Sequence, residues 1–156
     1  MDDTRKALGS WISGPQAAAE DAGADFGYRG KRLGLPEDGP GSIAPTGRRL
    51  GAVFIDWVLC QLIATQLIAR GDTGLASICT SGLFLLMSVV LVGTTGTTPG
   101  KRIFGLRVIG LGGARATVVQ ALIRTFLLLL VIPAVVWDRD TRGLHDKAAR
   151  TVEVRA

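Results

Sequence analysis

The sequence has few of the side chains that build metal, redox or catalytic centres. Its 156 residues include two cysteines and one histidine. Cys60 and Cys79 lie in separate apolar runs, and no spacing of cysteine or histidine fits a metal site. We therefore expect no disulfide, no metal and no other cofactor, and we interpret both cysteines as small packing residues.

The single histidine, His145, stands beside Asp146, a pair of the kind that acts in acid–base catalysis. No nucleophile and no second carboxylate at catalytic spacing accompanies it. The segment Gly93–Arg102 is rich in glycine and threonine, but Arg102 follows Lys101 where a phosphate-binding loop has serine or threonine. These patterns favour a protein that is not an enzyme, in which Asp146 caps a turn or helix.

Charged residues make up 20% of the chain but are almost absent from three long segments of the sequence. At ~1.5 Å rise per residue, segments of this length are about long enough to cross a ~30 Å hydrocarbon layer. The segregation predicts an all-α integral membrane protein. We expect spanning helices at 51–69 and 74–94, and a third apolar segment at 117–137 that is kinked, re-entrant or spanning.

Residues 1–47 are polar and lack the short apolar core of a secretory signal. We expect them to form a disordered or loosely docked cytoplasmic tail, followed by a transmembrane domain at 48–156. The net charge of +5 is compatible with nucleic acid, but the basic residues border apolar segments. Because only Trp11, Phe26 and Tyr28 accompany the soluble basic stretch, we expect no nucleic-acid partner.

The first two apolar segments are joined by the turn-rich segment Arg70–Gly74, which predicts antiparallel neighbours. One face of the first carries Arg49, Ala52, Asp56 and Cys60, and one stripe of the second carries Gly74, Ser77, Ser81 and Ser88. Small residues let helices approach closely in lipid, so we expect these faces to pack together. The stripe has two open interpretations, simple packing and a transport path.

Basic residues gather on one side of this expected hairpin: Arg48, Arg49, Lys101, Arg102, Arg107 and Arg115. The opposite loop carries Arg70, balanced by Asp72. The positive-inside bias places both basic flanks, and with them the N-terminus, in the cytoplasm. Lys101 and Arg102 are candidates to hold the phosphates of membrane lipids at that surface.

The third apolar segment is interrupted by Pro133, which removes a helical hydrogen bond. A simple span would place the C-terminus outside, but the tail that follows is strongly basic. The alternating residues 151–154 are typical of a strand, and 106–109 are their expected partner in the cytoplasm. We therefore favour a segment that bends back or lies partly in the interface over a simple span.

Asp56 and Arg124 each lie about two helical turns from an expected cytoplasmic boundary. An unpaired charge at that depth is costly, and opposite charges in a weakly polar interior attract strongly. Three interpretations are open: a buried ion pair that fixes helix order, a protonatable Asp56 in an ion or proton path, and a polar contact to a partner subunit.

Several motifs in a fixed order resemble the RDD family of bacterial membrane proteins, which is named for one arginine and two aspartates. They are Arg49 with Asp56, the segment Thr98–Val108, the segment Arg142–Asp146 and the segment Ala149–Val154. The resemblance covers about Thr46 to Arg155. Arg32–Glu37 and Gly39–Ser42 resemble the actinobacterial branch.

Carried over, the family arginine falls on Arg49 and the first aspartate on Asp56. The second aspartate falls on Asp146, with Asp138 as the alternative. The chain departs from the family at Arg150, where members often have glycine, and its third apolar segment is short for the family. The resemblance implies a multi-pass protein of the bacterial cell (inner) membrane. It also implies a role in transport of unknown ligands, and some members of the family resemble cation–proton antiporters in behaviour.

Two functions fit these observations. The first is a transport-related or ion-coupled component, with Asp56 as the titrating group. The second is a non-catalytic accessory or scaffold subunit that docks on a larger membrane complex or tethers a soluble partner through residues 1–47. Three short apolar segments make a thin wall for a pore, so we expect a homo-oligomer or a larger membrane complex in either case.

Overall fold

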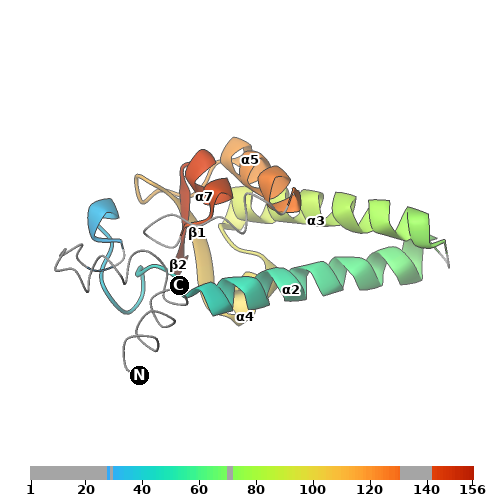
Figure 1. Cartoon of the computed structure of the whole chain (residues 1–156), viewed down its shortest axis with the longest axis horizontal. Coiled ribbons are helices and arrows are strands. Elements are labelled where there is room, and N and C mark those ends of the chain that lie inside the picture. The colour runs from blue at the N-terminus through green and yellow to red at the C-terminus, as the bar shows by residue number, and fades with distance from the viewer. Residues whose placement is uncertain (1–27, 29, 70–71, 131–141) are drawn as a thin grey trace, which may run out of the picture.

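The computed structural model describes residues 28, 30–69, 72–130 and 142–156, which form a long helical hairpin with a small cap at one end (Figure 1). Helix α2 spans Thr46–Ile63 and continues as a π-helical segment at Ala64–Ala69. Helix α3 spans Thr73–Thr95. These helices confirm the two apolar segments expected at 51–69 and 74–94. By length and composition both are long and apolar enough to cross a membrane.

Local chemistry sets the limits of both helices. Pro45 adopts the extended conformation and precedes the first residue of α2, Thr46. The helix therefore begins in a polar turn, which the apolar pattern alone does not predict. Asp72 caps α3 by accepting a hydrogen bond from the backbone N–H of Leu75 at 2.9 Å. Gly96 ends α3 at φ 76°, a left-handed conformation that favours glycine.

The cap contains a two-stranded antiparallel sheet. Strand β1, Leu106–Gly110, pairs with strand β2, Thr151–Arg155, with Val108 opposite Glu153. This confirms the pairing expected between 106–109 and 151–154, with one more residue in each strand. The short helix α4, Pro99–Ile103, leads into β1 from the end of α3.

Helix α5, Val118–Leu129, packs along α3 and begins with a capping box between Thr117 and Gln120. The short helix α7, Leu144–Ala148, packs on α5 and leads into β2. Because β1 precedes α5 and β2 follows it, the chain leaves the cap and returns to the same cap. This supports a third apolar segment that bends back. Its part from 131 to 137 lies outside the described residues.

The faces that join α2 and α3 are only partly those expected. The expected face of α2 is correct, since Arg49, Ala52, Asp56 and Cys60 are its buried residues. The buried residues of α3 are Ala76, Thr80, Phe84, Ser88 and Val92, so the expected stripe is wrong except at Ser88. Ser77 and Ser81 instead donate to carbonyl groups of their own helix. Phe84 faces α2, where its ring centroid lies 5.5 Å from that of Trp57.

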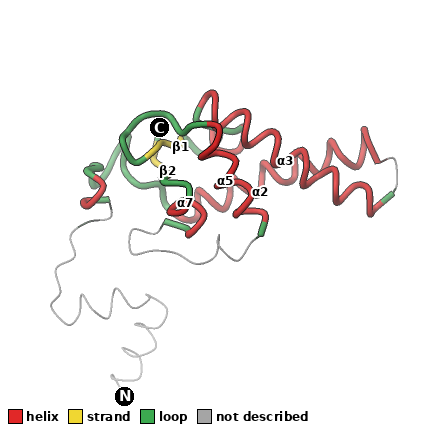
Figure 2. Tube along the Cα trace, turned by 90° about the horizontal axis from the view of Figure 1, so that it is seen from above, coloured by secondary structure: helices red, strands yellow, loops and turns green. Residues whose placement is uncertain are grey.

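Part of the expected tail is docked on the cap. A short 3-10 helix at Lys31–Leu33 leads to Ser42, Ile43 and Ala44, which are buried. Ile43 forms a β-bridge with Val154 and packs on the sheet. Residues 1–27 lie outside the described residues. Figure 2 shows the hairpin projecting away from the cap on which residues 30–44 dock.

Candidate functional site

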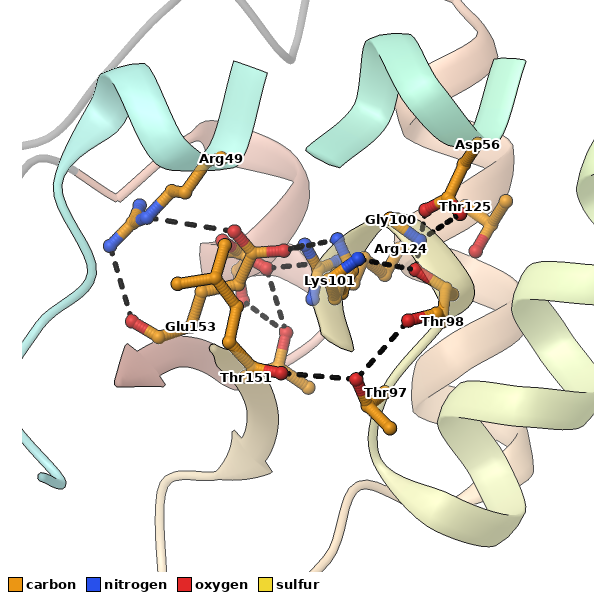
Figure 3. Close-up of polar contacts among 12 residues, drawn as sticks. Arg49, Asp56, Thr97, Thr98, Gly100, Lys101, Arg124, Thr125, Thr151 and Glu153 are labelled. Atoms are coloured by element: carbon orange, nitrogen blue, oxygen red, sulfur yellow. Dashed lines mark hydrogen bonds and ion pairs between the residues drawn. The ribbon is translucent and has the colours of Figure 1, made fainter. Parts of the chain in front are cut away.

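The most charged site of the described chain lies inside the cap, around Glu153. This residue occupies the centre of β2 and is 1% exposed. Three cations from three different helices reach its carboxylate: Arg49 of α2, Lys101 of α4 and Arg124 of α5 (Figure 3). The Lys101 Nζ lies 2.6 Å from Oε1, the Arg49 Nε lies 3.6 Å from Oε2, and Arg124 donates to Oε1 through Nη2. We call these four residues the Glu153 cluster.

The local structure explains why these side chains meet. Arg49 is on the buried face of α2, one turn before Ala52, and also donates to the Glu153 carbonyl oxygen at 3.3 Å. Lys101 lies three residues after Thr98, the N-cap residue of α4, and its side chain points toward Glu153 inside the cap. Arg124 shares the buried face of α5 with Ala121 and Thr125. The cluster therefore joins strand β2 to α2, α4 and α5.

Opposing effects act on the pKa of Glu153. Burial by itself raises the pKa of a carboxyl group, because it penalises the charged form. The positive charges of Lys101, Arg124 and Arg49, together with the hydrogen bond from Lys101, outweigh burial and hold the pKa of Glu153 well below its usual range. Glu153 is therefore ionised at neutral pH, and its charge is held by the fold.

This lowered pKa predicts a stability that decreases in acid. A carboxylate whose pKa is lower in the folded state stabilises the fold fully above its unfolded pKa, about 4.3 for glutamate. The contribution is lost as the pH falls from that value toward the folded pKa. We will see this in the thermal unfolding midpoint, measured in mild detergent from about pH 7 to pH 3: we expect the midpoint temperature to decrease once the pH is lower than about 4.3. The fall should be shallower for Glu153→Gln; equal slopes in both proteins would contradict the assignment.

Asp146 forms a second acidic centre next to the Glu153 cluster. Its Oδ1 lies 3.2 Å from Nε of Arg124 and accepts a hydrogen bond from the Thr151 hydroxyl at 3.1 Å. The Nε2 of His145 lies 3.7 Å from Oδ2. Asp146 lies in the first turn of α7, but Gly143 occupies the N-cap and no side chain caps this helix, so the expectation that Asp146 caps it is wrong. Arg142 donates to the carbonyl oxygens of Asp146 and Thr151.

Asp56 is 2% exposed and is held by the start of α4. Its Oδ1 accepts a hydrogen bond from the backbone N–H of Gly100 at 2.8 Å, and its Oδ2 accepts one from the Thr98 hydroxyl. Only glycine fits at position 100: a Cβ there would lie 3.0 Å from Cγ of Asp56 and would overlap the carbonyl oxygen of Ala52. The carboxylate therefore fixes the close contact between α4 and α2.

An ion pair between Asp56 and Arg124, one of the three interpretations of the sequence, is not formed among the described residues. Arg124 contacts Glu153 and Asp146, while Asp56 contacts Thr98 and Gly100. The physical reason is the position of α4, which packs against α2 and brings hydroxyl and backbone donors to Asp56. Helix α5 packs instead on α3 and α7, so its arginine meets the acids of the returning chain. Asp138, the alternative family aspartate, lies outside the described residues.

The two residues expected to hold lipid phosphates have different surroundings. Lys101 is 4% exposed and bonded to Glu153, so the expectation of a headgroup ligand is wrong for this residue. Arg102 is exposed on α4 and keeps that role as a hypothesis. The difference follows from the helical rotation of about 100° between consecutive residues.

Sequence reasoning missed Glu153 as the centre of the site. One signal was present: Glu153 is flanked by Val152 and Val154 in a strand, where a carboxylate with buried neighbours needs cationic partners. Within the described ranges, no group of three histidine, cysteine or acidic side chains is placed to hold a metal ion.

Comparison with known proteins adds a family to this geometry. The model of the RDD family matches residues 43–150, more than half of the chain, and this range contains Arg49, Asp56 and Asp146. No curated protein and no solved structure gave a significant match. The two apolar helices and the family together point to a membrane protein. The chain belongs to the RDD family.

Proposed function

We propose that α2 and α3 cross the bacterial cell (inner) membrane, with the cap and the N-terminus in the cytoplasm. Large apolar side chains are exposed along both helices, and they include Phe54, Leu67, Ile78 and Leu86. The exposed cations of the described chain gather around the cap and include Arg48, Arg102, Arg107, Arg115, Lys147 and Arg150. In a membrane, lipid chains would contact these exposed apolar side chains. The positive-inside bias favours a cytoplasmic position for the basic cap.

Cysteine accessibility tests this topology. In a Cys60→Ala/Cys79→Ala background, Ala156→Cys should react with a membrane-impermeant maleimide only after the cells are opened. Asp72→Cys, at the opposite end of the hairpin, should react in intact cells. Labelling of Ala156→Cys in intact cells would contradict the cytoplasmic cap.

We propose further that the protein acts as an oligomer in a transport-related or ion-coupled role, with Asp56 as the group that exchanges a proton or an ion. The observation that carries the proposal is that this membrane-depth carboxylate is bonded to α4, the helix that also supplies Lys101 to the Glu153 cluster. A change of charge at Asp56 would therefore alter what holds the cap. Intramembrane acids commonly mark ion paths. The described helices are too few to enclose such a path, which favours an oligomer.

Asp56→Asn tests the role in transport. The amide oxygen can still accept the N–H of Gly100, so the contact of α4 with α2 should persist while the titrating group is lost. We expect at least a tenfold loss of proton flux, measured with a pH-sensitive dye in liposomes under proton, sodium and potassium gradients. Asp72→Asn, an exposed helix cap, is the control that should retain flux.

A second candidate function is that of an accessory subunit of a larger membrane complex. It is favoured by the sealed position of Asp56, whose two oxygens both accept hydrogen bonds. In this case Asp56→Asn should retain flux and lose co-purification of a partner in mild detergent. If Asp56→Asn instead prevents accumulation in the membrane, the carboxylate is structural and neither role follows from it.

A further inference from the structure

Among the described residues, the interior of the cap contains more buried cations than buried acids. The cations that surround β2 and α7 are Arg49, Lys101, Arg124 and Arg142, and the acids among them are Asp146 and Glu153. Asp56, the remaining buried acid of the described chain, is bonded to Thr98 and Gly100 and not to these cations. A buried charge without an opposite charge is strongly destabilising. The excess therefore calls for an anion.

The buried side-chain atoms without a hydrogen-bond partner include nitrogens of Arg124 and Arg142, and also Oδ2 of Asp146. Arg124 is 4% exposed and Arg142 is 6% exposed, yet Nη1 of the first and Nε of the second have no hydrogen-bond partner. Within the described part of the chain, Arg142 forms no ion pair and donates only to carbonyl oxygens, those of Asp146 and Thr151. Buried donors without acceptors are rare in folded proteins, because each costs free energy.

The two guanidinium groups border the same turn. Arg124 contacts the side chain of Asp146 at 3.2 Å, and Arg142 lies 3.5 Å from the carbonyl oxygen of the same residue. Planar guanidinium groups bind the oxygens of carboxylate and phosphate with paired hydrogen bonds. An excess of two positive charges matches the charge of a phosphate group, about −1.5 to −2 at neutral pH when it is a monoester.

We propose that Arg124 and Arg142 hold a phosphate-type oxyanion in the cap, either as free phosphate or as the headgroup of an anionic lipid. The anion supplies acceptors for the two free nitrogens and balances the buried positive charge. The site does not depend on transport activity, so loss of flux in Asp56→Asn has no bearing on it. The undescribed stretch 131–141 carries Asp138 and Asp140, and an internal carboxylate is the competing source of negative charge.

The experiment measures thermal unfolding of the full chain in a phosphate-free, neutral detergent. One arm adds inorganic phosphate against sodium chloride of equal ionic strength, and the other adds phosphatidic acid, a phosphate monoester, against phosphatidylcholine. A ligand that binds only the folded protein should raise the midpoint, here by about 5 °C near saturation. A shift with free phosphate indicates the soluble ion, and a shift with phosphatidic acid alone indicates the lipid headgroup; either result supports the site.

Matched variants separate the site from surface charge. Arg142→Gln should abolish the shift or weaken the apparent affinity at least about tenfold, whereas Arg107→Gln, an exposed position of β1, should retain it. If Arg142→Gln does not fold, Arg142→Lys replaces it in the test, because it keeps the positive charge. This variant should bind the phosphate ligand more weakly than the wild type does. An equal shift in Arg142→Gln and the wild type overturns the proposal. The absence of any shift with either ligand also overturns it, and a large loss of stability in Asp138→Asn/Asp140→Asn would then assign the balancing charge to these carboxylates.

Discussion

Replacing Glu153 by glutamine is expected to lower the free energy of unfolding by about 3–5 kcal/mol, because the change leaves three buried cations without their shared acid. Arg49, Lys101 and Arg124 all contact this carboxylate, and all three are buried. Glutamine has nearly the same size, so the effect reports charge and not volume. The thermal unfolding midpoint in mild detergent should fall by about 10 °C.

The matched control for this change is Glu37→Gln, an exposed acid of the docked segment, which should alter the midpoint little. In addition, Glu153→Gln combined with Lys101→Gln should cost less than the sum of the two single changes, because the second change removes one of the stranded cations. Additive losses, or a Glu153→Gln protein as stable as the wild type, would show that the cluster does not hold the cap to the hairpin.

Gly100→Ala is expected to have an effect of similar size through packing. The added Cβ would overlap the carbonyl oxygen of Ala52 and lie 3.0 Å from Cγ of Asp56, so α4 must move away from α2. The movement would also lengthen the hydrogen bond from the Gly100 N–H to Asp56, now 2.8 Å. Overpacking together with loss of a hydrogen bond to a charged group predicts a cost of about 3–5 kcal/mol, measured by unfolding in detergent.

Gly82→Ala provides the comparison for this second prediction. Gly82 lies in the middle of α3, and nothing within 4 Å would contact an added Cβ. Alanine there should stabilise the helix by about 0.5–1 kcal/mol, since glycine loses more backbone freedom on folding. If Gly100→Ala and Gly82→Ala behave alike, the close approach of α4 to α2 is not a determinant of the fold.

The helical hairpin and the small sheet were predictable because their signals are local. The length of each apolar segment and the short turn at 70–74 define two antiparallel helices. The alternation of residues 151–154, together with the basic residues beyond the third segment, was enough to pair this strand with 106–109. The start of α2 was not predictable from hydropathy, because the helix begins at Thr46, in a polar turn that follows Pro45.

The contacts of individual charges were not predictable in the same way. An ion pair between Arg124 and Asp56 is one of three interpretations of the sequence, yet Arg124 contacts Glu153 and Asp146. Lys101, a candidate for binding lipid at the surface, is buried. These interactions join residues far apart in the sequence, and each depends on how α4 and α5 pack. A small difference in the rotation of either helix would change which charges meet.

The sequence by itself determined the two long apolar helices, the return of the chain to a basic cap, and the family. The helices and the return of the chain follow from hydropathy, charge and periodicity, which act over a few residues at a time, whereas the family follows from its motifs and from the match over residues 43–150. The tertiary structure alone decided that Glu153 gathers three cations and that Asp56 receives its hydrogen bonds from α4. The reason is that burial and electrostatic attraction operate between elements, and only the assembled cap brings those groups within bonding distance.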